Sequence, residues 1–166
     1  MISHTDFITH VLQVYQPKSY LELGLYQGET INKISSFVPR CIGVDIVPVN
    51  VNANCEFHQM TTDEFFTTFS ENIDAVFIDA DHSIESVRRD FENVVKLLNP
   101  NGVVFLHDTD PESDYFIDPG FCGDGYKIVK ELEQDPRFNI VTFPVAEAGV
   151  SVITFKNSTR CHLRGL

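Results

Sequence analysis

Residues 20–30 read YLELGLYQGET, from Tyr20 to Thr30, and this stretch decides the fold. An apolar strand pattern runs into a turn marked by Gly24 and Gly28, and a helix pattern follows. Asp45 closes the next strand pattern, 21 positions after Gly24. Glycines in such a turn let the backbone approach a ligand, and an acidic residue about 20 positions later can bind ribose hydroxyls. The stretch therefore predicts a nucleoside site at the carboxyl ends of the first two strands.

Two side chains near this turn indicate the kind of nucleoside. Tyr26 occupies the place of the second glycine of dinucleotide-binding turns, so it would crowd a pyrophosphate. Glu22 suits a cationic amine better than an anionic phosphate. Both features favour S-adenosylmethionine (SAM) over NAD and disfavour an NAD-dependent oxidoreductase. The alternative is a left-handed turn without a ligand, with Asp45 as a solvated strand-end residue.

Apolar runs rich in β-branched and aromatic residues recur along the chain and alternate with helix patterns. The predicted strands are Ser19–Leu23, Cys41–Ile46, Cys55–Gln59, Ile73–Ile78, Gly102–His107, Asn139–Phe143 and Gly149–Phe155. The predicted helices are 5–16, Gly28–Phe37, Thr62–Ser70, Ile84–Leu98 and Gly125–Gln134. Alternating strands and helices predict an α/β fold, a mostly parallel sheet with helices on both faces, and the short 144–148 connection predicts a closing antiparallel pair.

The chain fits one domain, 1–166, with a short N-terminal helix about 5–16, a core about 18–156 and a C-terminal tail 157–166. The stretch Thr109–Asp124 lacks periodicity and is either a substrate loop or a disordered acidic surface loop. Because only about eighteen residues precede the first strand, the site is either open or completed by a second copy of the chain or by a partner protein.

Composition narrows the class of protein further. With 24 acidic and 12 basic residues, the formal net charge is −12, which disfavours nucleic acid as a partner. No apolar run reaches the length of a membrane span, and the first ten residues lack a signal-peptide pattern. The four cysteines are scattered, without disulfide-framework or zinc spacing, so we expect a cytoplasmic protein.

Four motifs resemble class I SAM-dependent methyltransferases. They are Glu-x-Gly-x-x-x-Gly at 22–28 with Asp45, FIDADH at 77–82, HD at 107–108 and GDGYK at 123–127. FIDADH and HD are similar to the strand-end motifs of one bacterial group of that family. The resemblance implies a Rossmann-like seven-stranded sheet of order 3-2-1-4-5-7-6, with strand 7 antiparallel. It implies SAM as cofactor and a binding set of Glu22, Gly24, Leu25, Tyr26, Gly28, Asp45, Thr61, Thr62 and Asp79, with Met60 also beside the adenine. Thr61 or Thr62 can equally be a helix N-cap.

Acidic and imidazole side chains gather where strands four and five end. Because ligands of open α/β sheets bind beyond the carboxyl ends of the strands, these groups predict the reacting end of the site. The predicted catalytic residues are His82, His107 and Asp108. His82 is the first choice for general base, since imidazole titrates near neutrality, and His107 is the second. Asp108 would orient His107 or a substrate hydroxyl, and either histidine can alternatively be structural.

A divalent metal, Mg²⁺, is the alternative use of these carboxylates. Asp79 and Asp108 supply hard oxygen ligands, and Asp81 is a candidate third ligand. Related O-methyltransferases hold magnesium at the ends of strands four and five, but usually with Asn or Asp where this chain has Thr109.

The resulting functional hypothesis is methyl transfer to a hydroxyl or an amine of a small molecule, a sugar or a glycan precursor. The alternative is a non-catalytic SAM-binding module or partner subunit. Residues expected at the surface, without function, are His4, His10, His58, His162, Arg88 and Arg89.

Overall fold

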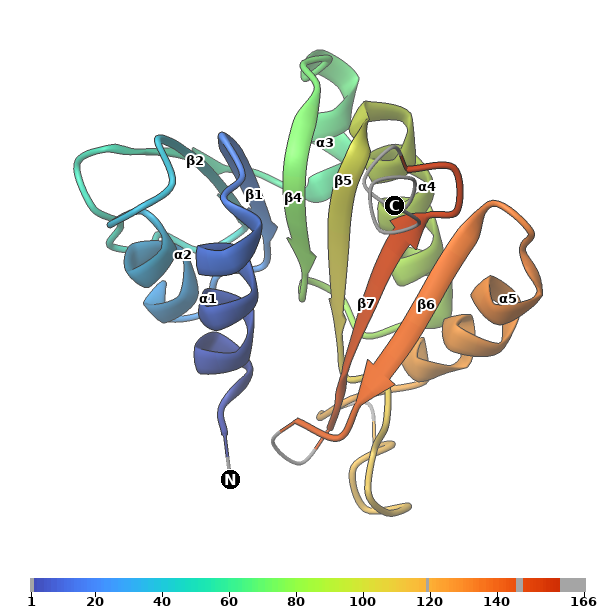
Figure 1. Ribbon diagram of the computed structural model, residues 1–166. Helices are drawn as coiled ribbons and strands as arrows, with labels where there is room; N and C mark the ends of the chain where they lie inside the picture. Colours follow the sequence, from blue (N-terminus) through green and yellow to red (C-terminus); the bar gives the residue numbers. More distant parts are fainter. Residues whose placement is uncertain (1, 119, 146–147, 159–166) are drawn as a thin grey trace.

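The computed structural model describes residues 2–118, 120–145 and 148–158, and its centre is one seven-stranded sheet (Figure 1). The strands are β1 (Ser19–Leu23), β2 (Arg40–Asp45), β3 (Cys55–Gln59), β4 (Ile73–Ile78), β5 (Leu98–His107), β6 (Phe138–Phe143) and β7 (Val150–Phe155). Their order in the sheet is β3-β2-β1-β4-β5-β7-β6. Strand β7 is antiparallel to both β5 and β6, whereas the other neighbours pair in parallel. The predicted Rossmann-like order is confirmed.

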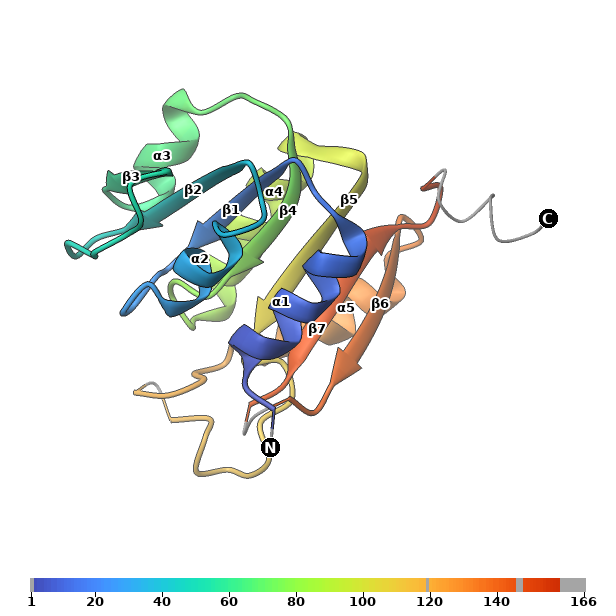
Figure 2. The ribbon, with the colours of Figure 1, turned by 60° about the vertical axis from the view of Figure 1, so that its left-hand side comes forward.

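Helices cover both faces of the sheet (Figure 2). They are α1 (His4–Tyr15), α2 (Glu29–Ile34), α3 (Thr62–Thr68), α4 (Ile84–Leu97) and α5 (Ile128–Gln134). Helices α1 and α2 pack on the face that includes Tyr20 and Phe77, and the other three pack on the face that includes Leu21 and Val76. Since side chains alternate along a strand, each buried strand contributes to both apolar layers.

Helix α4 is the clearest case of local sequence setting an element's bounds. The hydroxyl of Ser83 accepts a hydrogen bond from the Ser86 amide and caps the first turn. The helix ends at Leu97, and β5 begins at Leu98, earlier than the predicted Gly102. Pro100 favours extended backbone before it, which is why the strand begins immediately after the helix.

The two predicted helices that differ most from the structure are both shorter than the sequence pattern suggested. Gly28 has a φ of +77° and lies just before α2, which then runs only from Glu29 to Ile34. The predicted helix Gly125–Gln134 starts as a 3₁₀ turn at Gly125–Lys127 and becomes α-helical at Ile128. Helix α2 starts one residue later and stops three residues earlier than predicted, whereas the second helix differs only at its start.

The segment after β5, 109–124, contains no helix or strand in its described residues. It lies at the same end of the sheet as the N-terminus, where the parallel strands finish (Figure 1). Residues 159–166, most of the predicted C-terminal tail, lie outside the described residues. Among the helices of the described ranges, none has the length and apolarity needed to cross a membrane.

Candidate active site

The turn after β1 contains two residues with a positive φ. Gly24 has a φ of +82°, and a Cβ at this position would lie 2.1 Å from the carbonyl oxygen of Asp79. Tyr26 also has a positive φ, +50°, and its side chain is 84% exposed. Asp45 fixes the turn, because its Oδ2 accepts hydrogen bonds from the amides of Leu25 at 2.7 Å and Tyr26 at 3.3 Å. Its Oδ1 accepts a third bond, at 3.0 Å, from the amide of Val47.

Glu22 is a buried carboxyl group beside this turn. Its residue is 1% exposed, and its Oε2 accepts a 2.5 Å hydrogen bond from the Tyr20 hydroxyl. Burial raises the pKa of Glu22 well above its usual range; the Tyr20 bond works against this, while Asp79 and Asp45 add to it. Because Glu22 also lines the cavity described below, it can meet a ligand, and a cation there would favour its charged form.

Thr61 and Thr62 begin α3. Thr61 is the N-cap: its hydroxyl accepts a bond from the Glu64 amide, and the Glu64 carboxylate bonds back to the Thr61 amide. The N-cap role that the sequence left open between the two threonines therefore belongs to Thr61, as part of a capping box. Both threonines and Met60 line the cavity, so the capped end of α3 forms part of its wall.

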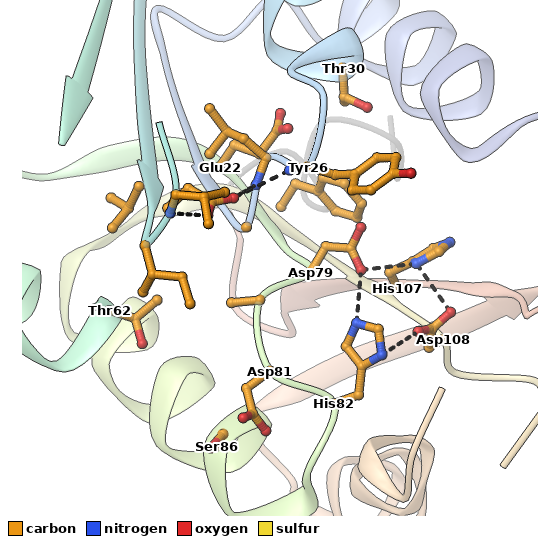
Figure 3. A pocket seen from close by; sticks show the side chains of 18 of the residues that line it. Glu22, Tyr26, Thr30, Thr62, Asp79, Asp81, His82, Ser86, His107 and Asp108 are labelled. Carbon is orange, nitrogen blue, oxygen red and sulfur yellow. Dashed lines mark hydrogen bonds and ion pairs between the residues drawn. The ribbon is translucent and has the colours of Figure 1, made fainter. Parts of the chain in front are cut away.

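Four polar side chains meet at the ends of β4 and β5 and point toward one another (Figure 3). The Nδ1 atom of His107 lies 3.0 Å from Asp79 Oδ1 and 3.1 Å from Asp108 Oδ1. His82 approaches the same two carboxylates, with Nδ1 3.3 Å from Asp108 Oδ2 and Nε2 3.8 Å from Asp79 Oδ1. Asp108 has a φ of +56°, a rare conformation for a residue other than glycine. Two carboxylates and two imidazoles thus form one cluster.

The two histidines of this cluster differ in the surroundings of their ring nitrogens and in their exposure. His82 Nδ1 contacts the carbonyl oxygen of Phe121, which can only accept a hydrogen bond, so Nδ1 is the donor and Nε2 is the ring nitrogen left for another partner. The His82 side chain is 34% exposed, whereas that of His107 is 15% exposed. His107 Nε2 is buried and has no hydrogen-bond partner within the described residues.

Burial and neighbouring charges shift the pKa values of His107 and Cys122. Burial alone would lower the pKa of His107, but the charges and hydrogen bonding of Asp79 and the charge of Asp108 raise it above the ordinary value. Burial, with Asp108 beside it, raises the pKa of the Cys122 thiol to about 12. His107 is thus held toward its protonated form, while Cys122 remains a neutral thiol at physiological pH.

One cavity of about 1160 Å³ joins the glycine turn to this cluster. It is large enough for a cofactor and a small acceptor, since ligand sites commonly measure about 300–1,000 Å³. Of the predicted cofactor residues, Gly28 does not line it and instead caps α2. Asp81 lines it, but its Oδ1 accepts a bond from the Ser83 amide, and the compact trio with metal-ligand geometry is Asp79, His82 and Asp108.

The sequence interpretation missed residues that also line the cavity. The prediction that His4 is a surface residue is wrong: its ring lies 4.4 Å from that of His107 and 5.9 Å from that of Phe77, measured between centroids. The first turn of α1 brings it there, fixed by a 2.7 Å hydrogen bond between the buried hydroxyls of Thr5 and Thr30. Burial lowers the pKa of His4, and His107 lowers it further.

Arg89 also lines the cavity, so the expectation that it only faces solvent was incomplete. Its Nε donates to Asp63 Oδ1 at 2.6 Å. From the segment after β5, the cavity walls include Phe116, Phe121 and Cys122. The predicted substrate loop therefore does border the site, although its role as a substrate contact stays a prediction.

The fold and the cavity define a class: an open α/β protein with a nucleoside-type glycine turn and an imidazole and carboxylate cluster at its strand ends. A family model described as a methyltransferase domain matches residues 21–109, more than half of the 166-residue chain. The chain belongs to this methyltransferase domain family. A comparison of the sequence with curated proteins finds no match.

Solved structures share the fold at low sequence identity. A methyltransferase from Podospora anserina, bound to S-adenosylhomocysteine (SAH), is 18% identical, with a TM-score of 0.75 over 92% of this chain and 78% of that one. An O-methyltransferase of tomaymycin synthesis from Streptomyces achromogenes, in complex with SAM, is 15% identical, with a TM-score of 0.68 over 91% and 78%. An O-methyltransferase from Bacillus cereus with SAH is 16% identical, with a TM-score of 0.63 over 93% and 82%.

Proposed function

We propose that this protein transfers a methyl group from SAM to a hydroxyl group, or an amine, of a small molecule. The observation that carries the proposal is the single cavity that joins an Asp45-braced glycine turn to the cluster of Asp79, His82, His107 and Asp108. Membership of the methyltransferase domain family and the SAM- or SAH-bound structures that share the fold support it. Methyl donor and acceptor can meet in such a cavity without crossing solvent.

The cofactor would lie across the tips of β1, β2 and β3. A carboxylate has about four lone-pair positions, and Asp45 uses three of them on backbone amides, so one remains for a ribose hydroxyl. Met60, Thr61 and Thr62 would flank the adenine. Glu22 and Asp79 would face the amino group of the methionine moiety, with the sulfonium directed toward the histidines.

His82 is the proposed general base. Its Nε2 is the ring nitrogen left for another partner, and its side chain is more exposed than that of His107. Bound SAM would supply the methyl group: a C–O bond to the acceptor would form and the S–C bond would break, with its electron pair moving to sulfur to give SAH. His82 Nε2 takes the hydroxyl proton. Positioning of the two reactants supplies most of the acceleration, and proton removal adds about 10²- to 10⁴-fold.

A divalent cation is a second candidate for the same end of the cavity. Ligand atoms of Asp79, His82 and Asp108 all lie within 4.8 Å of one another. Two carboxylates suit magnesium, whereas the imidazole of His82 suits a transition-series ion such as manganese or iron better. When bound there, the ion would lower the pKa of the acceptor hydroxyl. Asp81, bonded to the Ser83 amide, is the weakest of the predicted metal ligands.

Calorimetric titration with SAM and SAH, with EDTA or with magnesium chloride, tests the cofactor half of the proposal. Detection of SAH during incubation with a panel of hydroxyl and amine acceptors tests the transfer half. A non-catalytic SAM-binding module would bind both ligands and form no SAH with any acceptor. Absence of SAM binding under every condition would refute the proposal itself.

Substitution of the base gives a sharper test of the chemistry. His82→Ala is expected to lower kcat by about 10²- to 10⁴-fold and to change SAM affinity less than about threefold. The control is His58→Ala, because His58 on β3 contacts Glu56 and lies outside the cavity. A wild-type kcat in His82→Ala would refute His82 as the general base and assign the proton to another acceptor.

Two further parts of the proposal concern the cellular location of the protein and its assembly with other chains. The cysteines of the described ranges, Cys41, Cys55 and Cys122, are free thiols, as expected for the reducing cytoplasm that we propose as its location. We also propose that a second copy of the chain or a partner protein completes the acceptor side. Sedimentation at several concentrations, with SAM and without it, tests this, and a monomer with full turnover would refute it.

A further inference from the structure

The cavity is strongly acidic. Among the described residues that line it, seven are Asp or Glu and one is arginine. That arginine, Arg89, is bonded to Asp63 at the adenine end, so it does not offset the carboxylates at the acceptor end. SAM, Arg89 and a protonated His107 each carry one net positive charge, and these three charges neutralise only part of the six acidic groups that remain when the buried Glu22 is left out. An anionic acceptor would therefore enter against a negative potential, and a cationic one would be attracted.

Three aromatic rings stand beside the acceptor end. Tyr115, Phe116 and Phe121 form one cluster, with ring centroids 5.3 Å apart for Tyr115 and Phe116, 5.1 Å for Tyr115 and Phe121, and 6.2 Å for Phe116 and Phe121. Tyr115 is 67% exposed and Phe121 is 44% exposed. Apolar side chains gathered at the surface in this way commonly mark a binding site.

The loop that carries these rings is attached directly to the proposed base. The Phe121 carbonyl contacts His82 Nδ1, and the Gly125 amide donates to the His82 carbonyl at 2.9 Å. Gly123, with a φ of +55°, packs so closely that a Cβ there would lie 2.5 Å from the same carbonyl. The aromatic cluster is therefore held next to His82 and Asp108, where the acceptor must lie.

We propose that the acceptor is a hydroxyl compound that carries a protonated amine, and this inference rests on the proposed function. The ammonium group would lie against the faces of Phe116 and Phe121, within the field of Asp79 and Asp108, while its hydroxyl faces His82. Ring faces and nearby carboxylates both attract an ammonium ion, and neither attracts a carboxylate or a phosphate. The charge of the acceptor, rather than its carbon skeleton, is what this cavity selects.

Matched probes that differ in charge test the inference. The protein saturated with SAH is titrated, in EDTA, with dopamine, 4-methylcatechol and 3,4-dihydroxybenzoate, which share two adjacent hydroxyls. Glucosamine, glucose and glucuronate form a second series on a sugar. In at least one series the cation is expected to bind roughly tenfold more tightly than the neutral compound, with the anion weakest. Raising the salt from about 0.05 to 0.5 M should reduce this preference.

Ring substitutions locate the preference. Phe121→Leu and Phe116→Leu are expected to lower the cation-to-neutral affinity ratio by about 3- to 10-fold. SAM affinity should be unchanged. The matched control is Phe143→Leu, because Phe143 on β6 is a partly exposed ring, 38% exposed, that does not line the cavity. Equal ratios in all three variants would overturn the role of the aromatic cluster.

Other results would overturn the charge selection itself. They are an anion that binds as tightly as the matched cation, no binding of any of the six probes by a protein that binds SAM, or a reversed preference in magnesium chloride. Each leaves SAM binding, and with it the proposed function, intact. Failure of SAM binding would instead count against the proposed function.

Discussion

The buried carboxyl group of Glu22 should make SAM binding release a proton. Burial raises the pKa of Glu22 well above its usual range, so a larger fraction of this carboxyl group is protonated in the free protein than in an exposed glutamate. The ammonium group of SAM, placed against it, favours the charged form. The pKa of Glu22 is then lower in the complex than in the free protein, and the proton leaves to the buffer.

The size of the pH effect on SAM affinity follows from the thermodynamic linkage between proton binding and SAM binding. Between the pKa of Glu22 in the complex and its pKa in the free protein, SAM affinity should rise about tenfold for each pH unit. Calorimetric titration in two buffers with different ionisation enthalpies measures the protons released directly. We expect Glu22→Gln to release fewer protons than the wild type, by at most one, because the cavity histidines contribute equally in both proteins.

Tyr20→Phe is the matched control for this substitution. It removes the 2.5 Å hydrogen bond to Glu22 but keeps the carboxyl group, so proton release should persist. Since that bond lowers the pKa of Glu22, its loss should extend the pH-dependent range upward. Identical proton release by wild type and Glu22→Gln would refute the assignment of Glu22 to the cofactor amine.

Three further substitutions test the site and the fold. Asp45→Ala should weaken SAM binding at least about tenfold and loosen the turn, whereas Asp45→Asn should retain part of the affinity; equal calorimetric affinity for Asp45→Ala would contradict the ribose contact. Gly24→Ala should destabilise the protein by at least about 2 kcal/mol in chemical unfolding, because φ is +82° and the new Cβ meets Asp79. Gly120→Ala, with a nearest contact of 3.3 Å, is its control. Asp90 is buried, and burial raises its pKa from 3.8 to about 6. The free energy of unfolding should therefore fall by at most about 3 kcal/mol as pH rises through this interval. Asp90→Asn should therefore be stabilising at pH 8 and nearly neutral at pH 4, and equal effects at both pH values would contradict the burial argument.

The fold followed from the sequence because its signals are local. Apolar runs such as Ile73–Ile78 and the stripe of Ile84–Leu97 each specify one element, and the short connection before β7 specifies an antiparallel neighbour. The differences between predicted and observed bounds lie at the ends of helices and strands. Gly28 and Pro100 act on single backbone conformations there, and periodicity does not resolve them.

The candidate site was only partly accessible to the same reasoning. Asp79, His82, His107 and Asp108 follow strands, and strand ends meet at one edge of a parallel sheet, so their proximity was predictable. His4 was not, because it reaches His107 through the packing of α1, about one hundred residues away along the chain. A lone histidine in an amphipathic helix gives no signal of its own, although its position beside the N-cap Ser3 shows which end of the helix carries it.

The shared carboxylates of Asp79 and Asp108 have a consequence for enzymology. Each contacts both His82 and His107, so a proton gained by one ring changes the cost of protonating the other. A pH–rate profile of this protein will report apparent constants that belong to the four groups jointly. Double-mutant cycles across the two rings are expected to show strong non-additivity.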